Sequence, residues 1–121
     1  LLLFRVLGGV LEAMHGFKVD WYLSVGNETQ RLLWRLAHAH GTFLSLVHIG
    51  LAVSIAHMAG SPPRLASACL TSALVALPGG FLLGAFGGHG GDPGLGILLV
   101  PAGLILLVVA IIAVLRSLRS A

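Results

Sequence analysis

Residues 95–115 read LGILLVPAGLILLVVAIIAVL, an apolar run without a charged side chain that ends at Arg116 and Arg119. The hydrocarbon core of a bilayer is ~30 Å thick and needs ~20 apolar residues at a helical rise of ~1.5 Å per residue. This stretch therefore predicts a membrane-spanning helix.

The composition of the whole chain agrees with that interpretation. Of its 121 residues, 57% are hydrophobic and 9% are charged, and the mean hydropathy is +1.01. Soluble domains carry roughly 25% charged residues, and disordered chains combine low hydrophobicity with high charge. Both classes are excluded. The net charge of +3 rests on few groups, so the expected partner is the lipid bilayer and not a nucleic acid.

Two further apolar runs lie earlier in the chain, at 32–59 and 65–88. The first is closed by Pro62 and Pro63, and the second by a glycine-rich turn. Proline and glycine end helices because proline removes a backbone donor and glycine favours turns. Each run therefore predicts one more crossing.

The first segment, about 1–16, is apolar in bulk but contains charged side chains, among them Glu12. We interpret it as a fourth span. A cleaved signal peptide is the rival interpretation, and a glutamate inside the apolar run argues against it. Residues 17–31 predict an interfacial stretch, in which Asn27 is a favoured N-cap residue for a helix that begins near Glu28.

The expected fold is an all-α integral membrane protein, a four-helix transmembrane bundle that forms a single domain over 1–121. We expect a multi-pass protein of the bacterial inner membrane with both termini cytoplasmic. Lysine and arginine are enriched in cytoplasmic loops, and this orientation places four basic residues inside and three outside: Arg5, Arg64, Arg116 and Arg119 against Lys18, Arg31 and Arg35. It also predicts an outer aromatic belt of Trp21, Tyr22 and Trp34.

Small residues recur at every fourth position of the 65–88 run. Because lipid gives helices no hydrophobic reason to associate, close approach at small residues supplies the contact between them. The stripe predicts a docking groove for another helix, and it consists of Ala68, Ser72, Ala76, Gly80, Gly84 and Gly88.

Histidine is the chemical anomaly of this chain, with six residues: His15, His38, His40, His48, His57 and His89. Ionisable groups within a bilayer are costly and are by default candidates for function. In the predicted topology four of these residues converge at the outer end of the bundle. Glu12 precedes His15 by three residues, which places both side chains on one helix face. We therefore predict a metal site from His15, Glu12 and His89.

Helix geometry restricts how the remaining histidines can act. His38 and His40 point ~200° apart on a regular helix, so they cannot share one metal ion. His40 and His48 lie only ~80° apart in direction but ~12 Å apart along the axis. They can bracket one large cofactor, so the candidate cofactor ligands are His38, His40 and His48.

Imidazole binds haem iron, copper and zinc. A haem b with axial histidines from two helices is one expectation. A copper or zinc ion is another, and a chain without any cofactor is equally compatible with the sequence. The single cysteine, Cys69, excludes an internal disulfide and a cluster built on cysteine.

The segment Trp34-Arg35-Leu36-Ala37-His38-Ala39-His40-Gly41, followed at a distance by His48, resembles the Ala-His-Ala-His helix of small bacterial membrane proteins related to subunit I of haem-copper oxidases. In that family the helix supplies a haem-ligating histidine. The resemblance covers roughly one helix, and Gly41-Thr42-Phe43 departs from the family's usual continuation. The whole chain is also similar to small four-helix bacterial membrane proteins of unassigned function, which implies topology alone.

The sequence contains no recognisable catalytic motif: a phosphate-binding loop, a serine nucleophile motif and an HExxH helix are all missing. We expect that the chain is not an enzyme on its own. Three functions remain open. The first is a redox or electron-transfer subunit with a histidine site near the outer face. The second is an accessory subunit that docks with other membrane subunits or with itself. The third is a small transporter or proton path.

Overall fold

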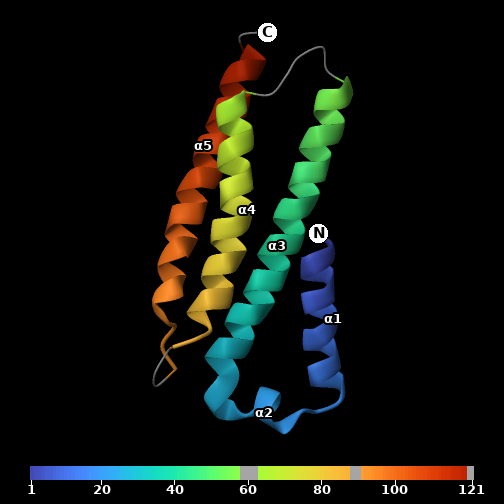
Figure 1. Cartoon of the computed structure of the whole chain (residues 1–121), viewed down its shortest axis with the longest axis vertical. Coiled ribbons are helices and arrows are strands. Elements are labelled where there is room, and N and C mark those ends of the chain that lie inside the picture. Colours follow the sequence, from blue (N-terminus) through green and yellow to red (C-terminus); the bar gives the residue numbers. More distant parts are fainter. Residues whose placement is uncertain (58–62, 88–90, 120–121) are drawn as a thin grey trace.

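The chain folds as a succession of helices joined by short turns (Figure 1), as seen in a computed structural model that describes residues 1–57, 63–87 and 91–119 and the side chains of these residues except 55–57 and 118. No strand occurs in this described part. The elements are α1 (Leu2–Gly16), α2 (Asp20–Leu23), the 3₁₀ turn η1 (Val25–Asn27), α3 (Glu28–His57), α4 (Arg64–Gly84), the 3₁₀ turn η2 (Leu95–Leu98) and α5 (Leu99–Arg119). The all-helical class is thus confirmed.

The long helices alternate in direction, and each packs on its neighbour in the chain (Figure 1). The most extensive interface joins α4 and α5, followed by α3 with α4 and α1 with α3. Within the described residues, α1 has no comparable backbone interface with α4 or α5. The contact with α3 therefore positions α1.

Three helices are long and apolar enough to cross a membrane, and they are α3, α4 and α5. Helix α1 has 15 residues in the structure, a length of ~22 Å against the ~30 Å of a hydrocarbon core. It reaches along part of α3 only (Figure 1). Helix α4 continues through Pro78 as one element.

One cluster of the core lies beside α2, where α1, α3 and α4 come together. Its buried members are Leu11, Tyr22, Leu33, Trp34 and Ala85. The Tyr22 and Trp34 rings are stacked with their centroids 6.5 Å apart, and Trp21 lies 5.6 Å from Trp34. The expected aromatic belt is therefore largely internal: Tyr22 and Trp34 are 2% and 9% exposed, and only Trp21 is open to its surroundings at 56%.

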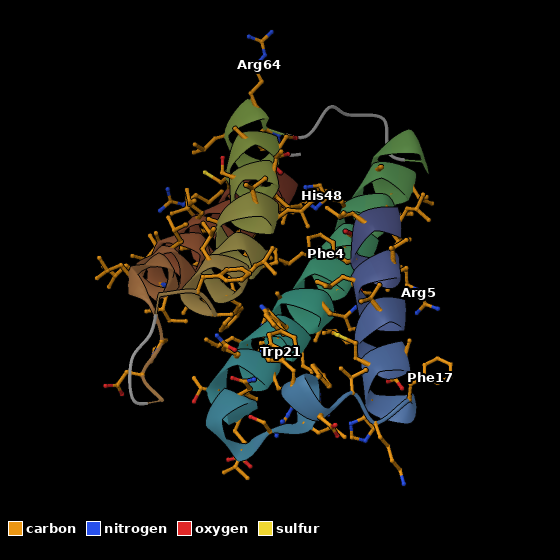
Figure 2. All side chains as sticks on the ribbon, turned by 60° about the horizontal axis from the view of Figure 1, so that its bottom comes forward. Phe4, Arg5, Phe17, Trp21, His48 and Arg64 are labelled. Carbon is orange, nitrogen blue, oxygen red and sulfur yellow. The ribbon has the colours of Figure 1, made fainter. Side chains whose placement is uncertain are left out.

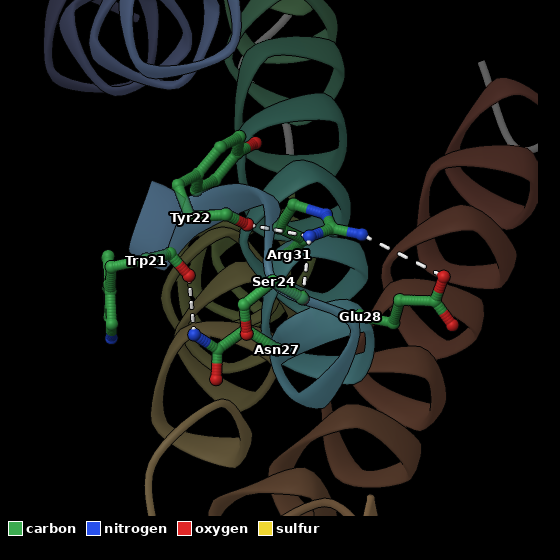
Figure 3. A network of polar contacts seen from close by, with 6 residues as sticks. All are labelled: Trp21, Tyr22, Ser24, Asn27, Glu28 and Arg31. Atoms are coloured by element: carbon green, nitrogen blue, oxygen red, sulfur yellow. Dashed lines mark hydrogen bonds and ion pairs between the residues drawn. The ribbon is translucent and has the colours of Figure 1, made fainter. Parts of the chain in front are cut away.

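The segment between α1 and α3 is folded onto this cluster by polar contacts (Figure 3). The Arg31 guanidinium donates to the carbonyl oxygens of Tyr22 at 2.6 Å and Ser24 at 3.1 Å. The Asn27 amide donates to the Trp21 carbonyl at 2.6 Å. Helix α3 begins at Glu28, at the position that Asn27 predicts.

The second cluster joins α3, α4 and α5 and contains the buried residues Cys69, Leu70 and Ala110. Towards the other end of the α4–α5 pair, glycines let the backbones approach. A Cβ atom on Gly80 would lie 2.9 Å from the Val100 nitrogen, and one on Gly103 would lie 2.8 Å from the Leu77 nitrogen. Helix α5 occupies the groove there, so the close approach takes place within this chain.

The predicted stripe of small residues is thus only partly available to another helix. Gly80 and Gly84 are buried against the start of α5 and against η2, whereas Ala68 and Ser72 are exposed. Gly88 lies outside the described residues. The turn after α4 is closed by the Gly94 N–H, which donates to the Gly84 carbonyl at 2.7 Å.

Candidate functional site

Helix α3 carries three imidazoles that share one hydrogen-bonding arrangement. His40 Nδ1 lies 2.9 Å from the Leu36 carbonyl, and His48 Nδ1 lies 2.9 Å from the Leu44 carbonyl. His38 Nδ1 lies 2.6 Å from the Phe4 carbonyl on α1. A carbonyl oxygen only accepts, so each Nδ1 carries the proton, and in the neutral ring the lone pair is on Nε2.

That tautomer is the one in which a histidine presents Nε2 to a metal ion. Metal-bound histidines commonly donate their other ring N–H to a backbone carbonyl or a carboxylate, which fixes the ring and raises its basicity. The backbone of α3 provides this second contact for His40 and His48, and α1 provides it for His38. All three candidate cofactor ligands are therefore oriented with Nε2 as the available ring atom.

His38 is built into the contact between α1 and α3. Its ring lies directly on Gly8, where an added Cβ atom would overlap the ring. The same contact is repeated in the opposite sense, because the Phe4 ring of α1 lies on Gly41 of α3. The ring of His38 is thus held against the α1 backbone, and its immediate role is to fasten one helix to the other.

His40 points to the other neighbour of α3. Its ring centroid lies 4.9 Å from that of Phe81 on α4. The expected divergence of His38 and His40 is therefore confirmed, since one ring contacts α1 and the other contacts α4.

His48 differs from the other two because its Nε2 atom is buried without a hydrogen-bond partner. Figure 2 shows His48 and Phe4 on the side of α3 that lies between α1 and α4. A buried polar atom without a partner costs roughly 1–3 kcal/mol. Thr42 Oγ1 shares this condition, whereas the buried Ser45 hydroxyl donates to the Gly41 carbonyl at 2.7 Å.

The predicted metal ligands are placed apart from these rings. Glu12 and His15 are both exposed on the last turns of α1, and His15 lies ~10 Å along the helix from Gly8, where His38 packs. His89 lies outside the described residues, as does the side chain of His57. Among the side chains that are described, no group of three or more His, Cys, Asp or Glu could hold a metal ion.

The sequence analysis did not identify the residues that join α1 to α3 around His38, namely Phe4, Gly8 and Gly41. A glycine inside a predicted helix was the available signal, because glycine in that position often marks a close approach. The chain has so many glycines that this signal did not single out these two.

Comparison with known proteins adds nothing to this picture, since no protein-family model, curated protein or solved structure matches the chain.

Proposed function

We propose that this chain is a multi-pass membrane protein in which α3, α4 and α5 cross the bilayer. The length and hydropathy of these helices support the proposal. The placement of charge supports it too, because no Asp, Glu, Lys or Arg occurs between Arg35 and Arg64, between Arg64 and Asp92, or between Asp92 and Arg116. The charged residues thus delimit three uncharged segments of spanning length.

We further propose that α3 would contribute an imidazole ligand to a haem or to a copper or zinc ion, in a redox or electron-transfer role. The observation that carries this proposal is the buried, unpartnered Nε2 of His48, whose Nδ1 is already bonded to the Leu44 carbonyl. Coordination would give this lone pair a partner. His40 lies ~12 Å away along α3 and its ring contacts Phe81, so His40 and His48 cannot bind the same ion.

The remaining ligand comes from outside the described side chains in this proposal. His38 lies against α1 and His40 against Phe81, so the three imidazoles that are described on α3 do not close a site by themselves. A second copy of the chain or another membrane subunit would supply the remaining ligand. The site is then a feature of an assembly.

The test is an absorption spectrum with metal analysis of the protein purified in mild detergent. A Soret band or a stoichiometric metal that is lost in His48→Leu supports the proposal. The matched control is Thr42→Val, which removes the other unpartnered buried polar atom of α3 without removing an imidazole and should leave the spectrum unchanged. A colourless, metal-free preparation from native membranes, with His48→Leu more stable than the parent protein, would overturn it.

A second candidate is an accessory subunit that docks through α1. Arg5 is exposed on α1, and its neighbour Phe4 packs on Gly41, within the uncharged stretch of α3. A guanidinium at that depth in a bilayer requires a polar partner. Gly9 has no atom within 4 Å of an added Cβ and lies on the same face as Arg5, which leaves room for a helix.

Copurification distinguishes this candidate from the first. A partner subunit that is retained at fixed ratio by the parent protein, lost in Arg5→Leu and retained in Arg35→Leu would favour docking through α1. A partner retained equally by all three proteins would exclude it.

A further inference from the structure

A groove lies between the first turn of α4 and the last turns of α5, at the end of the molecule opposite to α2. Its volume is about 710 Å³. Its apolar wall is formed by Leu65 of α4 with Val109 and Ile112 of α5, and its outer end is formed by Arg116 and Ser117. The groove is thus lined by apolar side chains along its length and by an arginine at its outer end.

The Asp, Glu, Lys and Arg side chains at this end of the described molecule are all arginines. Arg64 opens α4 and extends beyond it, away from the other helices (Figure 2), and Arg116 and Arg119 lie in the last turn of α5. The sequence contains no Asp or Glu between Glu28 and Asp92 or after Asp92. All four side-chain carboxylates belong to elements or turns of the opposite end: Glu12, Asp20, Glu28 and Asp92.

We infer that this groove binds an anionic phospholipid, with one acyl chain along Leu65, Val109 and Ile112 and the phosphate at Arg116. The inference rests on the proposed membrane location, since the charged end of α5 then lies at the level of the headgroups. A guanidinium matches the geometry of a phosphate because its N–H groups can donate in parallel. Basic pockets between membrane helices bind anionic headgroups by the same chemistry.

The charge distribution selects an anionic lipid over a zwitterionic one. Phosphatidylcholine also offers a phosphate, but its quaternary ammonium would lie near Arg116, at an end of the chain that has no Asp or Glu side chain to receive it. Phosphatidylglycerol carries no such cation. The apolar wall in turn selects a lipid over free phosphate, because inorganic phosphate leaves Val109 and Ile112 uncovered.

Native mass spectrometry of the detergent-solubilised protein, titrated with phosphatidylglycerol or phosphatidylcholine, tests the inference. We expect one phosphatidylglycerol per chain to be retained, with retention roughly tenfold weaker for phosphatidylcholine and for Arg116→Gln. Ile112→Trp fills the groove without changing its charge and should weaken retention as well. The matched control, Arg35→Gln, changes an exposed arginine near the opposite end of α3 and should retain lipid as the parent does.

Equal retention of both lipids, or unchanged retention by Arg116→Gln and Ile112→Trp, would overturn the inference. Displacement of the lipid by millimolar inorganic phosphate would do so too, because it would show that the acyl chain contributes nothing. Alkaline carbonate extraction of membranes is run on every variant. Release of the protein by carbonate contradicts the proposed membrane location, whereas a membrane-retained protein without lipid preference contradicts the groove alone.

Discussion

The two outer helices of this molecule, α1 and α5, are attached in different ways. Helix α5 approaches α4 backbone to backbone, with Gly80 against Val100 and Gly103 against Leu77. Helix α1 approaches α3 by exchanging side chains, with His38 on Gly8 and the Phe4 ring on Gly41. Both interfaces use glycine. At the α4–α5 interface the glycines contact a backbone, and at the α1–α3 interface they contact an aromatic ring.

The difference determines how each interface tolerates change. A main chain within a helix moves aside only if the whole helix shifts or its own hydrogen bonds break, whereas a ring can rotate about χ1 and χ2. The α4–α5 pair is therefore the rigid part of the molecule, and α1 is fastened by contacts that can be released one at a time.

Gly80→Val should produce the largest effect. The new side chain would meet the Val100 backbone nitrogen, which an added Cβ atom would approach to 2.9 Å. We expect a loss of roughly 3 kcal/mol in the free energy of unfolding, at the upper end of the usual cost of overpacking. Thermal unfolding in detergent, followed by circular dichroism, measures it.

The adjacent residue provides the control. Gly79 has no atom within 4 Å of an added Cβ, so Gly79→Ala should be neutral or raise stability by ~0.5–1 kcal/mol through helix propensity. If both substitutions destabilise equally, the backbone approach at Gly80 is not what joins α4 to α5.

Gly8→Ala should have an intermediate effect. The added methyl group would displace the His38 ring and weaken its bond to the Phe4 carbonyl. We expect a loss of about 1–2 kcal/mol, smaller than for Gly80→Val because the ring can move. Proteolysis of α1 in the folded protein should become faster as well.

The matched variant here is Gly9→Ala, because Gly9 is open where Gly8 is closed. It should be neutral or slightly stabilising. A loss equal to that of Gly8→Ala would contradict the fastening of α1 through His38 and would point to a general intolerance of α1 to substitution.

The smallest effect is expected from Glu28→Gln, which tests the connection between α1 and α3. Its carboxylate lies 3.9 Å from Arg31, and the Glu28 side chain is 71% exposed, so its loss should change stability by less than ~0.5 kcal/mol. Arg31→Gln should cost more, because it removes the bonds to the Tyr22 and Ser24 carbonyls. Equal losses would show that the ion pair holds the segment.

The long helices could be predicted from the sequence. Apolar runs closed by Pro62, Pro63 and the glycines after α4 gave the long elements, and Asn27 gave the start of α3. Helix geometry also gave the divergence of His38 and His40, because a 100° step per residue holds wherever a helix is regular.

The sequence did not predict which helix packs against each helix face. Periodicity says which residues share a face, but the choice of the helix that covers it depends on shape. The small-residue stripe on α4 predicted a contact with another helix but not which helix, and in the structure its Gly80 contacts α5 and its Gly84 contacts η2. The end of α1 was predicted at about residue 16, and α1 does end at Gly16. The left-handed residue that follows, Lys18 with φ of 51°, carried no signal in the sequence, because it is not a glycine.

Cys69 is 9% exposed in the cluster that joins α3, α4 and α5. The reactivity of its thiol therefore reports whether these three helices are packed together. Because it is the single cysteine of the sequence, a thiol-reactive dye reports on one location only. Alkylation should stay slow while the three helices are together and accelerate once they separate, without any engineered label.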